Sequence, residues 1–156
     1  MVARNLTVRL ATLNDADVIA TMSRDLIEHG LGWSWTPQRV ARNIRNRDTA
    51  TIVAEDRGRI ISFGIMYFGE EHAHLNLLAV KPAFQRTGVG RRMVDWLRQS
   101  CTVAGIAVIY LELRASNVEG RTFYEACGFE ETGTVPRYYG GVETALCMAL
   151  RLRKTD

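Results

Sequence analysis

Alternating apolar and polar positions divide the chain into short strands separated by helices. Alternation over residues 5–10 predicts a first strand, and two runs flanking Asp56-Arg57-Gly58-Arg59 predict a hairpin. These runs cover 49–55 and 60–68. Further strands are predicted at 72–80, at 108–114, after Gly128-Phe129 as far as Arg137, and at 144–152, with a loop over 138–142.

Helical spacing of apolar residues predicts four helices between these strands. Asn14 is expected to cap the first, with Asp15 and Asp17 in its first turn, and Gly30 to end it. Thr36-Pro37 supplies an N-cap and a first-turn proline for a second helix that continues to about Arg47. The remaining two helices are expected at 89–104 and 117–127.

The length of 156 residues indicates one domain over 1–156, large enough for a real core. Apolar residues make up 47% of the chain, which is typical of a soluble globular protein. The longest apolar runs have the length of strands, so no transmembrane helix is expected. Residues 1–10 lack the apolar region of a signal peptide, which favours the cytoplasm.

The net charge of +3 comes almost wholly from arginine, with 18 Arg and 2 Lys. The arginines are scattered, and the densest group is Arg39, Arg42, Arg45 and Arg47. On a helix the first three would share one solvent-facing side, and we favour a solvated helix face over a nucleic-acid surface. A nucleic-acid surface would instead give steeply salt-dependent binding.

The cysteines and histidines do not combine into an obvious site. Cys101, Cys127 and Cys147 are odd in number and lie in separate elements, which suits reduced, buried thiols. His72 and His74 would share one face of a strand and could form a metal pair. Because no Cys or third His stands nearby, we expect solvated edge histidines and no metal site.

The segment Gln85-Arg86-Thr87-Gly88-Val89-Gly90 joins a buried strand to a helix start. Gly88 and Gly90 would leave room for a ligand against the main chain, and free helix N–H groups favour a phosphate. Arg86, Arg91 and Arg92 add positive charge. The segment matches neither a P-loop nor a dinucleotide fingerprint, and a tight strand-to-helix turn is the alternative.

Glu112 is a carboxylate in an otherwise apolar strand, where it shares a face with Tyr110 and Arg114. It could form a surface ion pair with Arg114 or act as a general base near neutral pH. Tyr124 lies on the fourth helix and by itself would be interpreted as a packing residue.

Three motifs resemble those of known acetyltransferases. Q-R-T-G-V-G-R, at 85–91, resembles the acetyl-CoA pyrophosphate loop of the Gcn5-related N-acetyltransferase (GNAT) superfamily. R-A-S-N, at 114–117, and F-Y-E-x-x-G-F, at 123–129, resemble ribosomal-protein-alanine and protein N-terminal acetyltransferases. The resemblance covers about residues 72–150. It implies an α+β GNAT fold, in which a mixed, mostly antiparallel seven-stranded sheet flanked by about four helices holds acetyl-CoA between splayed central strands.

The resemblance also implies roles for individual residues, with acetyl-CoA as the co-substrate. Glu112 would accept the proton of the amine, and Tyr124 would give a proton to the departing thiolate. Main-chain groups of the strand would pair with the pantetheine arm, and the loop would hold the pyrophosphate. The implied cofactor-binding residues are Leu78, Ala79, Val80, Arg86, Thr87, Gly88, Val89, Gly90, Arg91 and Asn117. Since both reactants would bind in one cleft, we expect direct attack in a ternary complex.

The acceptor is expected to be an amine. Tyr138 and Tyr139, followed by Glu143-Thr144-Ala145, resemble a pattern whose tyrosines line the peptide groove of N-terminal acetyltransferases, although Thr144 replaces the usual Asp. This favours a peptide α-amine. A small amine, such as a polyamine, amino acid or aminoglycoside, and a non-catalytic acyl-CoA-binding module are the alternatives.

Two tryptophans precede the second predicted helix. In the resembled family this segment forms one wall of the acceptor groove, so Trp33 and Trp35 would line that groove or only cover the edge of the core. Neither a nucleic acid nor a membrane is expected as a partner, and a homodimer is left open.

Overall fold

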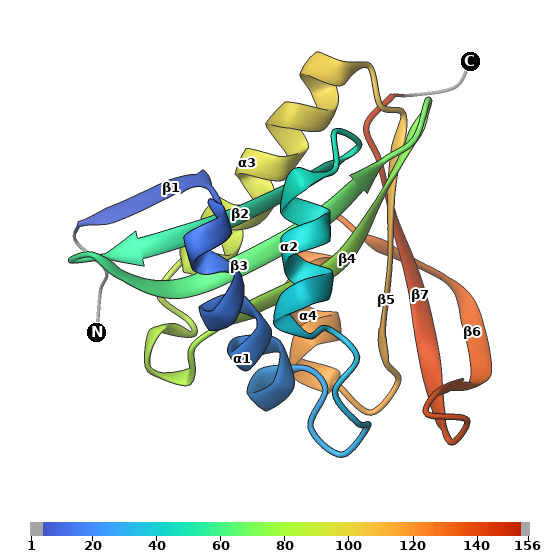
Figure 1. Ribbon diagram of the computed structural model, residues 1–156. Helices are drawn as coiled ribbons and strands as arrows, with labels where there is room; N and C mark the ends of the chain where they lie inside the picture. The colour runs from blue at the N-terminus through green and yellow to red at the C-terminus, as the bar shows by residue number, and fades with distance from the viewer. Residues whose placement is uncertain (1–4, 154–156) are drawn as a thin grey trace.

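The computed structural model describes residues 5–153, and Figure 1 shows how its elements are arranged. The expectations for residues 1–10 and for a domain over 1–156 therefore extend outside the described residues. Within this range, one sheet has the strand order β1-β2-β3-β4-β5-β7-β6. The strands are β1 (Leu6–Leu10), β2 (Thr49–Asp56), β3 (Arg59–Phe68), β4 (His72–Val80), β5 (Val108–Arg114), β6 (Glu130–Tyr139) and β7 (Glu143–Arg151).

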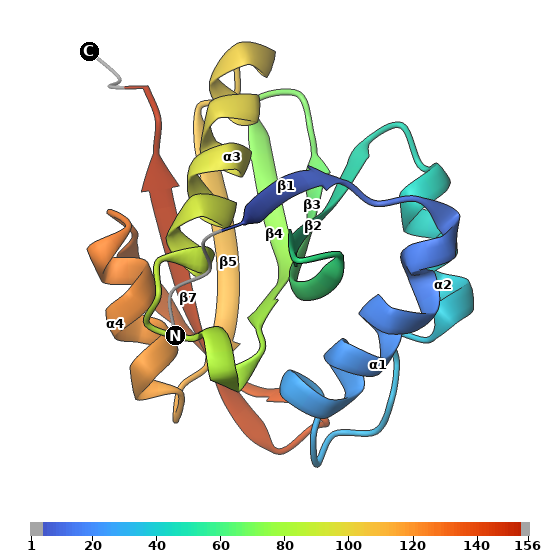
Figure 2. The same cartoon turned by 90° about the vertical axis from the view of Figure 1, so that its left-hand side faces the viewer.

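Only β4 and β5 pair in parallel, which confirms the predicted mixed, mostly antiparallel sheet. Helices cover both faces, with α1 and α2 on one face and α3 and α4 on the other (Figure 2). They are α1 (Ala16–Leu26), α2 (Pro37–Arg45), α3 (Val89–Ala104) and α4 (Val118–Ala126). No helix in the described part of the chain is both long and apolar enough to cross a membrane.

The expected bounds of the first helix are wrong at both ends. A 3-10 turn over Leu13–Asp15 precedes α1, and the Asp15 carboxylate accepts from the Thr12 N–H at 2.7 Å, so Asn14 is not the cap. The helix ends at Leu26, before the predicted Gly30. The Glu28 carboxylate binds main-chain N–H groups of the following loop, which draws the chain away from the helix axis.

A β-bulge in β4 changes which face its side chains occupy. Met66 pairs with Leu75 and Ile65 with Leu77, so Asn76 is left without a partner on β3. One extra residue reverses the alternation of a strand. Leu75 accordingly packs in the core beside α3, whereas Leu77 packs in the core beside α1 and α2.

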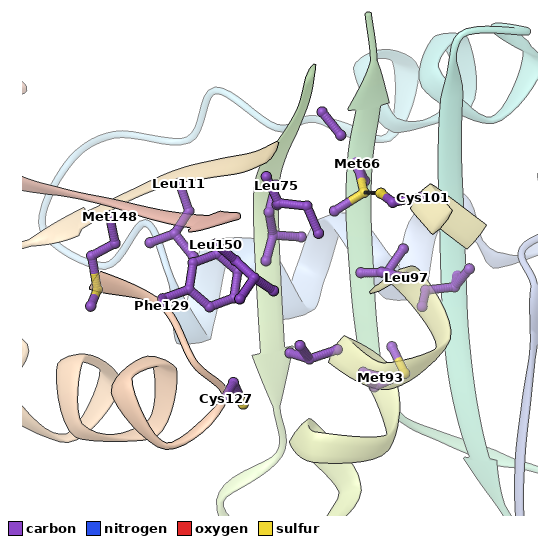
Figure 3. Close-up of a cluster of buried hydrophobic side chains, with 14 of the residues drawn as sticks. Met66, Leu75, Met93, Leu97, Cys101, Leu111, Cys127, Phe129, Met148 and Leu150 are labelled. Atoms are coloured by element: carbon purple, nitrogen blue, oxygen red, sulfur yellow. Dashed lines mark hydrogen bonds between the residues drawn. The ribbon is translucent and has the colours of Figure 1, made fainter. Parts of the chain in front are cut away.

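The α3–α4 side holds the larger of these two cores (Figure 3). From α3, Met93, Leu97 and Cys101 pack toward Met66 and Leu75 of the sheet. On the α4 side, Phe129 and Cys127 pack near strands β5 and β7. This core fixes the N-terminal half of α3 and the C-terminal half of α4 against the sheet. The three cysteines are free, as expected, although Cys147 is only half-buried.

The central strands diverge, as the resemblance implies. β4 and β5 pair only from His72–Val108 to His74–Tyr110. Beyond that point β5 remains paired with β7, and β4 with β3. The edge of β4 that faces β5 therefore has no strand partner from about residue 76 onward. The split opens a passage between the two faces of the sheet.

Candidate active site

A cleft of about 1420 Å³ lies where β4 and β5 diverge. Its lining comes from both central strands, the start of α3, α4, the loop between α1 and α2, and the hairpin between β6 and β7. The cleft thus has a part beside α3, here called the cofactor end, and a part beside the α1–α2 loop and the hairpin, here called the acceptor end.

The cofactor end is built around the start of α3. Gly88 is the N-cap with φ of 90°, and no side chain caps the helix. The first amide N–H groups of α3 therefore lack intrahelical partners and lie at the positive end of the helix dipole. Arg86 also has a positive φ of 62°, which curves the preceding loop. This arrangement of main-chain donors fits a diphosphate.

The loop residues contribute unequally. Arg86, Gly88, Gly90 and Arg91, which the resemblance assigns to the cofactor, line the cleft. The Val89 side chain is buried in the core, so only its main chain can serve a ligand. The Thr87 hydroxyl donates to the carbonyl of Phe84.

Gly90 has a second role in this loop, and the expectation that Arg92 adds charge there is wrong. A Cβ at position 90 would lie 3.0 Å from the Phe123 ring, so Gly90 allows close packing between α3 and α4 in addition to lining the cleft. Gly88 has open space around it, and its positive φ is what requires glycine. Arg92 turns away, because its guanidinium donates to the carbonyl of Leu6 at 3.3 Å.

The β4 residues Leu78, Ala79 and Val80 line the cleft with their β5-facing edge unpaired. An unpaired strand edge offers N–H and C=O groups to an extended ligand that carries amides, such as a pantetheine arm. Asn117 also lines the cleft and caps α4, where its Oδ1 accepts from the Gly120 N–H at 2.9 Å. The cofactor end therefore fits acetyl-CoA in both its diphosphate and its amide-bearing arm.

Glu112 lines the cleft and forms a hydrogen-bonded network with residues of β4 and β6. His74 Nε2 lies 2.8 and 2.9 Å from the two carboxylate oxygens, to which its N–H donates. The Tyr138 hydroxyl donates to one of these oxygens at 3.0 Å. The other ring nitrogen of His74 donates to Oδ1 of Asn76, the bulged residue. Both ring nitrogens of His74 face oxygen atoms, an arrangement that favours the protonated ring over the neutral one.

The network shifts both pKa values. The hydrogen bond from His74 lowers the pKa of Glu112 below its ordinary value. The same bond raises the pKa of His74 above 6.5. The group in this network that titrates closest to neutrality is therefore His74, and the role of Glu112 as a general base stays a prediction.

The alternative pairing of Glu112 with Arg114 is also wrong. Arg114 pairs with Glu143 of β7 at 2.8 Å and donates to the carbonyls of Ile27 and His29, each at 2.8 Å. It thereby fastens the α1–α2 loop to the central strands.

The two histidines differ, although the sequence treats them alike. His72 is exposed, whereas His74 is half-buried against Glu112. The alternation of apolar and polar residues does not reveal the contact between His74 and Glu112, because the two residues lie 38 positions apart in the chain. Among residues 5–153, no three His, Cys, Asp or Glu side chains are grouped as metal ligands would be.

Tyr124 reaches the same cleft from the opposite face of the sheet. Its ring packs edge-on against Phe123 and Phe129, with centroid distances of 5.1 and 5.5 Å. Burial raises the pKa of its phenol well above the usual value, so the hydroxyl keeps its proton at neutral pH. Glu112 and Tyr124 line one cleft because the sheet is open between β4 and β5.

The acceptor end contains Tyr138 and Tyr139, which both line the cleft and pack edge-to-face at 4.9 Å. The expected loop at 138–142 is shorter, because β6 continues through Tyr139. The hairpin touches the α1–α2 loop, since a Cβ at Gly140 would lie 3.6 Å from Leu31.

The α1–α2 loop is organised by Glu28, which the sequence analysis missed. Its buried carboxylate accepts from the Ser23 hydroxyl at 2.8 Å, the Ser34 hydroxyl at 2.6 Å and the Trp35 N–H. These bonds place Trp35 in the cleft lining. Trp33 is directed elsewhere, because its indole N–H donates to the carbonyl of Ala20 at 3.1 Å, so it covers α1.

Comparisons with known proteins agree with this geometry. The family model for an acetyltransferase (GNAT) domain matches residues 18–152. The [ribosomal protein bS18]-alanine N-acetyltransferase of Escherichia coli K12 is 28% identical over 144 residues, covering 90% of this chain and 95% of the relative. The crystal structure of the ribosomal-protein-S18-alanine N-acetyltransferase from Escherichia coli has a TM-score of 0.83 at 27% identity, over 97% of this chain and 96% of that one. An acetyltransferase-like protein of Salmonella typhimurium, solved with its cofactor acetyl-CoA, shares the fold with a TM-score of 0.80 at 18% identity, over 97% and 96% of the two chains.

Proposed function

This chain belongs to the GNAT acetyltransferase family, and from that premise we propose that it acetylates the α-amino group at the N-terminus of a polypeptide. The donor is acetyl-CoA. The observation that carries the proposal is the Glu112 carboxylate in the lining of the cleft, hydrogen-bonded to His74 and Tyr138 beside the hairpin that carries Tyr138 and Tyr139. The resemblance to bacterial enzymes named for an alanine of ribosomal protein bS18 supports a polypeptide acceptor.

Glu112 is proposed to take the proton that the acceptor ammonium must lose before it can attack. Acetyl-CoA, when bound, supplies the thioester that the freed amine attacks. A carboxylate with a lowered pKa is a weak base, so its partner matters. When His74 is neutral, its Nε2 can accept at 2.8 Å the proton that Glu112 receives. Activity should therefore rise with pH through the raised pKa of His74.

Tyr124 is proposed to give its hydroxyl proton to the thiolate sulfur. Its phenol stays protonated at neutral pH because it is buried, so the proton is available when the sulfur leaves. Main-chain N–H groups of Leu78 to Val80 are the proposed donors to the thioester oxygen, where negative charge develops. With both reactants held in one cleft, no covalent enzyme intermediate is required.

We also propose that the enzyme works in the cytoplasm. The three free cysteines support this, because a reducing compartment keeps thiols unpaired.

The test is release of free CoA thiol with a panel of acceptors, followed by mass spectrometry of the products. Peptides with a free α-amine should be acetylated at that amine. The same peptides with a formylated N-terminus and an internal lysine should not react. Turnover of polyamines, amino acids or aminoglycosides, with no turnover of peptides, would contradict the proposed acceptor while leaving the acetyltransferase assignment intact.

A further inference from the structure

The charges at the acceptor end are nearly all paired. Glu112 is bound by His74, and Arg114 pairs with Glu143 at 2.8 Å. The Glu28 carboxylate is buried and occupied by several N–H and hydroxyl donors. Among the described residues of this end, the exception is the Arg39 guanidinium, which lines the same cleft.

The Arg39 guanidinium has unused binding capacity. Within residues 5–153, no carboxylate lies within 4.0 Å of it, and the recorded hydrogen bonds of Arg39 involve only its main chain. The sequence of α2, PQRVARNIR, contains no acidic residue that could compete for it. A guanidinium offers five N–H donors in a planar fork that matches a carboxylate.

Arg39 is also held in place. Its guanidinium carbon lies 3.8 Å from the centre of the Trp35 ring. Trp35 is itself buried, and its main-chain N–H is held by Glu28. Stacking on a fixed indole lowers the conformational entropy that an arginine loses on binding an anion. Arg42 and Arg45, which lie on the same helix, are exposed and do not line the cleft.

This corrects the expectation of one solvated arginine face on the second helix. Arg42 and Arg45 fit that description, but Arg39 is half-buried and belongs to the cleft. The difference arises because the Glu28 network turns Trp35 beneath the first turn of α2.

We propose that Arg39 is a carboxylate-binding site at the acceptor end, and that the enzyme prefers polypeptides with an acidic side chain close to the acetylated N-terminus. This inference rests on the proposed function for the choice of a polypeptide. The same chemistry would bind the free carboxylate of an amino acid acceptor, so the test includes both sources.

The experiment compares kcat/KM for peptides that are identical except for one Asp, moved stepwise from the second to the fifth position. Each has an Asn and a Lys counterpart. At one position we expect the wild-type enzyme to favour Asp over Asn by about 5- to 10-fold, mostly through KM. The second arm compares kcat/KM for alanine, which has a free carboxylate, with kcat/KM for alaninamide, which has none.

Three variants locate the effect. Arg39→Gln should reduce kcat/KM of the preferred Asp peptide to that of its Asn counterpart. Arg39→Glu should favour the Lys peptide instead. Arg42→Glu makes the same charge change on the same helix outside the cleft, and it should keep the Asp preference. Thermal unfolding and acetyl-CoA affinity of each variant show whether the fold is intact.

Equal kcat/KM for all peptides in the series, or an Asp preference that survives Arg39→Gln, would overturn the inference. Inhibition by RNA through Arg39 without any Asp preference would overturn it in favour of a nucleic-acid surface. If wild-type enzyme acetylated no peptide, the proposed function would fail. A preference for alanine over alaninamide that Arg39→Gln abolishes would then still support the carboxylate site.

Discussion

The two ends of the cleft are made in different ways. The cofactor end uses mostly main-chain groups from one continuous segment, the end of β4 and the start of α3, with Asn117, the N-cap of α4, beside it. The acceptor end uses side chains from β4, β5, β6 and β7, together with side-chain and main-chain groups of the α1–α2 loop. Main-chain donors are fixed once the helix and strand form, whereas a side-chain network depends on every element that contributes a member.

The comparison shows where substitutions should act. Most side chains of the cofactor loop can change without moving the amides that face the ligand. At the acceptor end, removal of one group leaves its partners unpaired in a half-buried place, which is costly. Loss of a side chain at the acceptor end should therefore leave the main-chain donors of the cofactor end in place.

The largest expected effect is that of Glu112→Gln, which removes the proton acceptor and keeps the shape. We expect kcat to fall by about 100-fold or more. Acetyl-CoA affinity, measured by calorimetry, should stay the same because the cofactor end does not use this side chain. Glu125→Gln, on the exposed side of α4, is the matched control. An unchanged kcat would show that another group accepts the proton.

Tyr124→Phe should have the next largest effect, since it removes one hydroxyl and keeps the ring packed between Phe123 and Phe129. Loss of a proton donor to the leaving sulfur should lower kcat by about 10- to 100-fold. Steady-state kinetics with Tyr110→Phe, an exposed tyrosine on β5, provide the comparison. Similar kcat values for the two variants would contradict a proton-donating role for Tyr124.

Arg114→Gln tests whether the acceptor end is assembled by long-range side-chain bonds. The variant loses the pair with Glu143 and the bonds to the carbonyls of Ile27 and His29. We expect KM for the peptide to rise by about 10-fold as the α1–α2 loop loosens, with KM for acetyl-CoA unchanged. Arg121→Gln breaks exposed ion pairs with Glu125 of α4 and Glu131 of β6, and it should alter neither constant. A rise in KM for acetyl-CoA alone would reverse the assignment of the two ends.

Gly90→Ala should disturb the cofactor end through packing. The added Cβ would lie 3.0 Å from two atoms of the Phe123 ring, which must then move. We expect a loss of about 1–3 kcal/mol in the free energy of unfolding, measured with denaturant, and weaker acetyl-CoA binding. Gly133→Ala meets open space and is the control. Adding Phe123→Leu should recover part of the loss, and a failure to do so would point to a different clash.

The smallest expected effect concerns stability and pH. The raised pKa of His74 contributes stability fully below 6.5, and this is lost as pH rises through the folded-state value. The lowered pKa of Glu112 contributes stability above pH 4.5, and this stability is lost as the pH falls through the folded-state pKa of Glu112. His74→Gln should therefore destabilise most between these limits, by about 1 kcal/mol or less because the pair is partly exposed. Chemical denaturation of both proteins across the pH range measures this difference in the free energy of unfolding. A difference that grows above pH 6.5 would contradict the His74–Glu112 ion pair.

The sequence by itself determined the cofactor end and most of the sheet. The segment at 85–91 predicted a ligand loop at a helix N-terminus, and alternation placed Glu112 on the face opposite Leu111 and Leu113. Such features depend on local main-chain geometry and on periodicity, both of which a short stretch of sequence specifies. The bounds of α1 were less accurate, because Asp15 and Glu28 bind main-chain groups in a way that spacing does not reveal.

Only the tertiary structure decided the acceptor end. In the folded protein His74 contacts Glu112, and Arg114 contacts Glu143 and the α1–α2 loop. Trp35 and Arg39 line the cleft, whereas Trp33 packs on α1. Each of these contacts joins segments far apart in the chain or depends on a bulge or buried carboxylate that turns a side chain. Periodicity tells which face a residue occupies, but the partner that meets it there is fixed by how the whole sheet and its helices pack.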